Sequence, residues 1–161
     1  MLLRIIGLVL LYVPAHYVHA SCIGVGCTCT VAVTGGTVAF GNYNPISGTA
    51  LSTTGTVAVT CSALVIGLNV SYVIALNAGA NGTFAARKMI LVSTLQYNLY
   101  TDAGHTTVWG DGTAGTSTIS DSYLLSLLSH TVNYTVNGLL PASQYVPPGA
   151  YTDTITVTVT Y

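Results

Sequence analysis

Four cysteines are the residues of this sequence whose side chains and spacing are best suited to chemistry. Cys22, Cys27 and Cys29 fall within eight residues, and Cys61 follows much later. Three close thiolates could begin a zinc site, but the fourth ligand is distant and thiols of exported proteins tend to oxidise. Four cysteines permit three disulfide connectivities. We expect Cys29 to pair with Cys61, because each lies in an alternating run typical of a strand, which leaves Cys22 and Cys27 as a possible second, local pair.

The other groups capable of catalysis are scattered and share no motif. His105 and His130 are not accompanied by an acid or a nucleophile in any known pattern. Residues 110–115 read GDGTAG, which has the spacing of a dinucleotide-binding loop. Such a loop must open a helix, whereas the strand-like run TSTIS follows here, so a turn is favoured. We therefore predict that the protein is not an enzyme and binds neither a metal nor a small-molecule cofactor.

Charge is unusually sparse in this chain. Charged residues make up 4% of its 161 residues, and the net charge is −1. Binding to nucleic acid needs a basic face that neutralises phosphates, so that class of partner is excluded. Low charge also predicts poor solubility as a free monomer and suits a protein that packs against other copies. The adjacent basic residues Arg87 and Lys88 are favoured as the solvated start of a strand.

Residues 1–20 have the pattern of a secretory signal peptide. Arg4 supplies the basic start, Ile5–Val13 the apolar segment, and Val18–Ala20 a small-residue cleavage site. The apolar segment is too short to span a bilayer as a helix. A buried strand or helix at this position is the less favoured alternative. We expect residues 21–161 to be the exported mature domain.

Short alternating runs separated by turn residues fill the rest of the chain, which is the pattern of an all-β sandwich or barrel. The last run, Tyr151–Tyr161, reads YTDTITVTVTY. Because side chains alternate between the faces of a strand, one face carries threonines and the other is apolar. The apolar face comprises Ile155, Val157, Val159 and Tyr161. A terminal strand of this kind is either sealed by a neighbour or offered to another chain.

Two local features lead to further expectations. The leucine pairs of Tyr123–Leu128 favour a helical turn. Four aromatic residues are expected mainly in the core, with a glycan-binding surface as the alternative; they are Tyr43, Tyr97, Tyr100 and Trp109.

Three segments, in this order, resemble one known family. They are CTVAVTGGTVAFGNYNPISGTAL with VAVTCS, then LQYNLYTDAGHTTVWGDGT, then YTVNGLLPASQYVPPGAYTDTITVTVTY. Together they resemble the spore coat protein U domain, the subunit family of archaic chaperone–usher pili, over nearly the whole of residues 29–161. The resemblance implies an incomplete immunoglobulin-like β-sandwich that lacks its final strand and is completed by donor-strand complementation. It also implies a disulfide between the first two strands, which matches Cys29 and Cys61.

The resemblance implies partners and a location as well. Ile155, Val157, Val159 and Tyr161 would line the groove left by the missing strand and contact a periplasmic pilus chaperone. The outer-membrane usher and neighbouring pilus subunits would be the other partners. The subunit would pass through the periplasm to fimbriae on the cell surface, where it would serve adhesion and biofilm formation.

One departure from the family pattern concerns the strand that a subunit donates to its neighbour. Only Ser21–Thr28 lies between the expected cleavage site and Cys29, a length of about 26 Å when extended. Ile23 and Val25 alternate within it and form a possible short donor segment. A subunit that accepts a strand but donates poorly suits a fibre tip or a role outside a long polymer. The alternative is a self-complete, secreted, lectin-like or adhesive domain that is not part of a polymer.

Overall fold

The structure of this protein, a computed structural model, describes residues 5–12, 26–34, 36–64, 66, 68–126 and 128–161. Within these ranges it contains strands and no helix, so no described helix could cross a membrane. The strands are β1 (Ile5–Tyr12), β2 (Thr28–Thr34), β3 (Thr37–Tyr43), β4 (Leu51–Ser62), β5 (Leu68–Leu76), β6 (Arg87–Ile90), β7 (Thr94–Tyr100), β8 (Ile119–Leu125), β9 (Ser129–Leu140) and β10 (Gly149–Thr160). The all-β prediction is confirmed.

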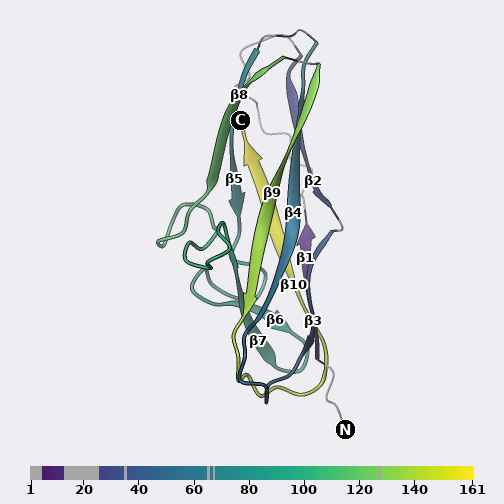
Figure 1. Ribbon diagram of the computed structural model, residues 1–161, viewed down its shortest axis with the longest axis vertical. Helices are drawn as coiled ribbons and strands as arrows, with labels where there is room; N and C mark the ends of the chain where they lie inside the picture. Colours follow the sequence, from purple (N-terminus) through teal and green to yellow (C-terminus); the bar gives the residue numbers. More distant parts are fainter. Residues whose placement is uncertain (1–4, 13–25, 35, 65, 67, 127) are drawn as a thin grey trace.

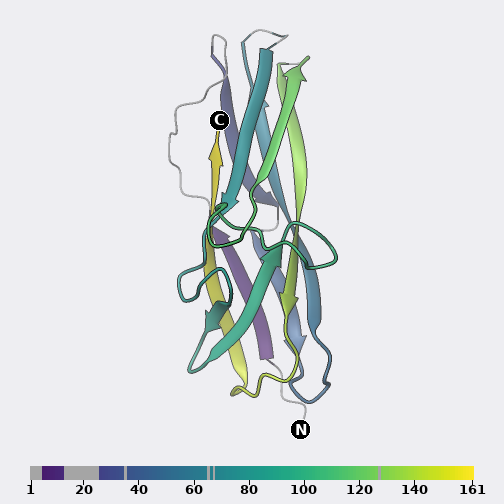
Figure 2. The ribbon, with the colours of Figure 1, turned by 90° about the vertical axis from the view of Figure 1, so that its left-hand side faces the viewer.

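The strands form two long layers (Figures 1 and 2). One layer contains β2, β4 and β9, which pair antiparallel in that order. The other contains β3, β1 and β10, with β5 and β8 continuing beyond β10. The β6–β7 hairpin joins the layers at one end, because β6 pairs with β10 and β7 pairs with β9. The fold is therefore an immunoglobulin-like sandwich.

Strand alternation places the core between the layers. On β4, Val57, Val59 and Cys61 are buried while the residues between them are partly exposed. Trp109 is also fully buried, and its indole N–H donates to the carbonyl of Ile74 at 3.1 Å. The layers approach closely where β3 crosses β9, because a Cβ atom on Gly138 would lie 2.9 Å from the Phe40 ring. A side chain there would force the layers apart.

A tyrosine cluster holds the layers together at the other end. The hydroxyls of Tyr72 on β5 and Tyr134 on β9 are 2.6 Å apart, and that of Tyr134 donates to the Asp121 carboxylate on β8. Burial and these hydrogen bonds raise the pKa of Tyr134 well above its usual range. Residues 123–125, the first half of the segment Tyr123–Leu128 for which the leucine pairs predicted a helical turn, are the last residues of the strand β8. That prediction is wrong, because pairing with β5 along the whole of β8 outweighs local preference.

Candidate functional site

The strand β1 occupies a site that no other described segment fills. It pairs parallel with β10 from Ile5–Gly149 to Tyr12–Thr156, and antiparallel with β3 from Ile5–Tyr43 to Leu10–Thr37. Figure 2 shows the purple strand between yellow β10 and blue β3. Among the described residues, β3 and β10 have no ladder with each other. We call the space between the facing edges of β3 and β10 the acceptor site.

The wall of the acceptor site formed by β10 has the alternation expected from the sequence. Ile155 and Val157 are buried, and Val159 and Tyr161 are half-buried. Toward the start of β10, the same face continues through Asp153 and Tyr151, which are also buried. The threonines between these residues are exposed or half-exposed. The inner face of β10 is therefore apolar along its length apart from one carboxylate.

The two halves of β10 differ in their neighbours. Residues 149–156 pair with β1, whereas residues 157–160 pair with β5 across the other edge (Figure 1). Because β1 ends at Tyr12, the edge of β10 beyond Thr156 has no ladder partner within the described part of the chain. A longer strand in the acceptor site could extend along this edge, over Val157 and Val159.

Arg87 is buried, so the prediction that it begins a strand as a solvated residue is wrong. Its side chain is 0% exposed rather than solvated, whereas the neighbouring Lys88 is half-exposed. Its guanidinium donates to the Asn98 side-chain oxygen at 2.6 Å and to the carbonyls of Asn77 and Trp109, both at 2.7 Å. Burial lowers the pKa of this guanidinium from its ordinary value. Arg87 thus connects three segments that alternation alone could not have brought together.

Asp153 anchors the lower half of β10 from the inner face. Its carboxylate accepts hydrogen bonds from the Tyr97 hydroxyl at 2.7 Å and from the Ala80 backbone N–H at 3.0 Å. Burial, and then the neighbouring carboxylate, raise the pKa of Tyr97, so this hydroxyl stays a donor. Gly79 allows the contact: its φ is +85°, and a Cβ atom there would lie 2.2 Å from the carboxylate. These bonds position the wall of the acceptor site.

The disulfide predicted between Cys29 and Cys61 is confirmed. The two sulfurs are 2.03 Å apart, and the residues are direct partners in the β2–β4 ladder. With a sequence separation of 32 residues, the chain-entropy model gives a contribution of about 3–4 kcal/mol. Cys22, Ile23 and Val25 lie outside the described residues. The Cys22–Cys27 pair and the short donor segment therefore stay predictions.

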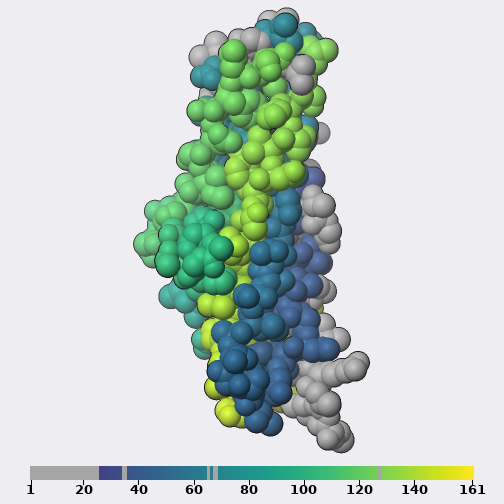
Figure 3. Space-filling view, viewed as in Figure 1, coloured from purple at the N-terminus to yellow at the C-terminus, as the bar shows by residue number. Residues whose placement is uncertain are grey.

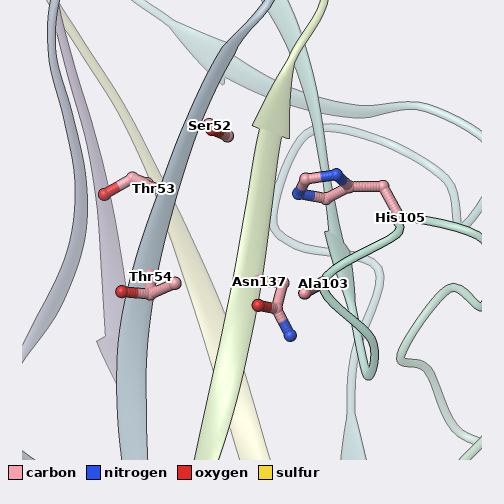
Figure 4. Close-up of a pocket in the computed structure, with 6 residues that line it drawn as sticks. All are labelled: Ser52, Thr53, Thr54, Ala103, His105 and Asn137. Atoms are coloured by element: carbon pink, nitrogen blue, oxygen red, sulfur yellow. The ribbon is translucent and has the colours of Figure 1, made fainter.

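A second feature is an open hollow on the outer surface (Figure 4), lined by Ser52, Thr53, Thr54, Ala103, His105 and Asn137. Its polar groups come from β4, β9 and the loop after β7. The His105 ring packs edge-on against Tyr100, with centroids 5.2 Å apart. The lining offers hydroxyls, an amide and an imidazole, which can bond a polar ligand. Of the four aromatics considered as a glycan surface, Tyr43, Tyr97 and Trp109 are buried, as the core interpretation expects.

The described strands thus form an immunoglobulin-like sandwich in which β1 lies between the facing edges of β3 and β10. The Spore Coat Protein U domain model matches residues 17–158, and the chain belongs to this family. It is 33% identical over 151 residues to Protein U of Myxococcus xanthus, covering 86% of this chain and 79% of that protein.

A solved structure shares the fold. It is the crystal structure of the CsuC–CsuE chaperone–tip adhesion subunit pre-assembly complex from archaic chaperone–usher Csu pili of Acinetobacter baumannii. The TM-score is 0.51 at 20% identity, and the match covers 84% of this chain. This chain spans only 40% of the length of the chain it matches.

Proposed function

We propose that this protein is an exported structural subunit of an archaic chaperone–usher pilus, assembled by donor-strand complementation. The observation that carries the proposal is the acceptor site between β3 and β10. If residues 1–20 are removed as a signal peptide, β1 leaves with them and both edges lose their ladder partner. A strand from another molecule must then fill the site, first from a periplasmic chaperone and then, at the outer-membrane usher, from a neighbouring subunit.

Apolar side chains on β3 and β10 surround the acceptor site and are buried when it is filled. Val38 and Phe40 on β3 and Tyr151 and Ile155 on β10 are all at most 4% exposed in the filled structure. Burying each such side chain stabilises the fold by about 1.5–3 kcal/mol. An empty site would therefore remove a free energy comparable to the whole stability of a domain. Exchange of one bound strand for a better one can drive assembly without a nucleotide, because backbone hydrogen bonds form with any extended partner.

The direct test is the behaviour of residues 21–161 with and without a strand donor. We expect this chain alone to aggregate or to melt at a low temperature in circular dichroism. Co-expression with an archaic pilus chaperone should give a soluble 1:1 complex in gel filtration and a large rise in melting temperature. A monomer that is stable alone and unaffected by the chaperone would contradict the proposal.

Position in the fibre and adhesion are finer parts of the proposal. Cleavage after Ala20 would leave only residues 21–28 ahead of Cys29, too few for a full donor strand and a connector. We therefore place the subunit at or near the tip, exposed to surfaces that the fibre contacts. The product would pass through the periplasm to the cell surface and serve adhesion and biofilm formation.

Exposed apolar side chains at one end of the sandwich are the observation that favours a role in adhesion. Leu64 and Ile66 in the β4–β5 loop are 74% and 65% exposed, and Leu128 in the β8–β9 loop is 59% exposed. The loops adjoin, because the Ala63 N–H donates to the Leu128 carbonyl at 3.0 Å. The end of the sandwich that carries these loops is at the top of Figure 3. Apolar side chains gathered at an exposed end mark interaction surfaces.

The double variant Leu64→Ser/Leu128→Ser should therefore reduce attachment of piliated cells to a hydrophobic plastic several-fold. Pilus assembly, measured by surface immunoblotting, should be unchanged because neither side chain belongs to the core. Ser62→Ala/Ser129→Ala is the control near the same end. Equal attachment by the double variant and the wild type would remove this surface from the adhesive role.

A self-complete secreted binding domain is the second candidate, and one observation favours it. With residues 5–12 retained, β1 completes the sandwich from the same chain. The polar hollow beside His105 would then be the place for a ligand. Mass spectrometry of the protein recovered from cells separates the two candidates: a chain beginning at Ser21 favours the pilus subunit, and one retaining residues 5–12 favours the self-complete domain.

A further inference from the structure

The acceptor site has a specific occupant in this chain, and the register shows how closely it fits. Over residues 5–12, every residue of β1 has a Cα partner on β10, and most also have one on β3. The strand is therefore central, with both of its edges paired. Such a strand buries its backbone polar groups in ladders instead of leaving them to water.

The register also sets which residues of β1 lie beside the buried residues of β10. Gly7, Val9 and Leu11 are the partners of Tyr151, Asp153 and Ile155 on β10. Those three residues of β10 are all buried. The ladder therefore sets the backbone of residues 7, 9 and 11 beside the buried residues of β10.

We propose that residues 5–12 are an internal placeholder for the donor strand: the uncleaved chain completes its own sandwich, and removal of residues 1–20 is the step that makes it able to accept a strand. The inference concerns regulation of the acceptor site and rests on the proposed function. Two strands cannot pair with the same edges of β3 and β10 at once. A donor from another molecule can therefore enter only after β1 leaves.

Covalent attachment makes the placeholder a strong competitor. A segment tethered to its binding site has an effective concentration on the order of millimolar. A free donor at micromolar concentration would be outcompeted even if its intrinsic affinity were similar. Cleavage removes this advantage in a single irreversible step. The uncleaved subunit is thus kept folded and unable to polymerise.

The test compares residues 1–161 with residues 21–161, both made without export so that cleavage does not occur, and both refolded from urea under oxidising conditions in the presence of the probe, because residues 21–161 are expected to aggregate without a strand donor. The probe is a fluorescent peptide with the sequence of residues 5–12, flanked by lysines for solubility. Residues 21–161 should bind the probe in fluorescence anisotropy and gain thermal stability. The uncleaved chain should bind at least about tenfold more weakly and gain no stability.

A proline variant tests whether β1 itself causes the difference. Proline cannot donate to a ladder and is excluded from central strands. Val9→Pro in the uncleaved chain should restore probe binding to the level of residues 21–161, and Leu3→Pro, before β1, should leave binding weak. Hydrogen exchange gives a second readout: amides of β3 and β10 should be protected in the uncleaved chain and exchange faster in Val9→Pro.

The outcomes separate this inference from the proposed function. Equal binding by the two wild-type chains, or no effect of Val9→Pro on both binding and exchange, would overturn the placeholder while leaving strand acceptance intact. A chain of residues 21–161 that is stable and binds no probe would overturn both. Weak binding by the uncleaved chain, strong binding by residues 21–161 and rescue by Val9→Pro together support the placeholder.

Discussion

Ile155→Asp, in the chain that begins at residue 21, is expected to abolish capture by a pilus chaperone. Ile155 is 0% exposed and is the partner of Leu11 when the acceptor site is filled. The substitution removes about 1.5–3 kcal/mol of stabilisation from apolar burial. It also places a carboxylate among the apolar side chains of the core, which is unfavourable without hydrogen-bonding partners. A total loss of about 4 kcal/mol corresponds to roughly three orders of magnitude in affinity.

The neighbouring position provides the control for this variant. Thr154 lies on the same strand but is exposed, so Thr154→Asp adds the same charge to the outer face. It should leave capture within about twofold of the wild type. Co-purification from the periplasm with a tagged chaperone measures both variants, and total protein in the export fraction corrects for synthesis. Normal recovery of Ile155→Asp would show that the inner face of β10 does not carry the acceptor site.

Arg87→Met is expected to lower the free energy of unfolding by about 2–4 kcal/mol, although methionine has a similar reach and is apolar. The cost arises because the Asn77 and Trp109 carbonyls would lose the guanidinium donor, while the Asn98 side-chain oxygen would keep only the Leu99 N–H. Urea unfolding of the uncleaved chain, followed by tryptophan fluorescence, measures the change, since Trp109 is fully buried.

The adjacent residue tests whether this effect depends on burial rather than on charge. Lys88→Met removes the same formal charge from a half-exposed side chain, so it should change stability by less than about 0.5 kcal/mol. Arg87→Lys should recover only part of the loss, because an ammonium group cannot reproduce the guanidinium fork that reaches three acceptors. Equal effects of Arg87→Met and Lys88→Met would refute the role assigned to the buried network.

Much of the candidate site could be read from local pattern. The alternation on β10 identified Ile155 and Val157 as inner-face residues, and they are buried. The alternating runs around Cys29 and Cys61 predicted neighbouring strands and a disulfide, and both are present. These predictions are confirmed because side chains alternate between the two faces of a strand with a period of two residues. This alternation can be recognised in consecutive residues whichever strands are neighbours in the sheet.

Other features had no local signal. Arg87 looks like a solvated residue in sequence, and only the convergence of Asn77, Asn98 and Trp109 around it makes burial favourable. The leucine pairs near Tyr123 suggest a helical turn until pairing with β5 is considered. In each case the deciding interactions join residues far apart in the chain, and sequence spacing does not report them.

For this protein, the sequence alone determined an all-β domain, its family, its main disulfide and the apolar face of its last strand. Each of these depends on residue type and on a period of two. Tertiary structure alone decided that residues 5–12 lie between β3 and β10 as a strand. An apolar run of that length is compatible with a signal segment or a buried strand. The edges of β3 and β10, which do not pair with each other, favour the strand conformation of residues 5–12 for as long as these residues remain attached to the chain.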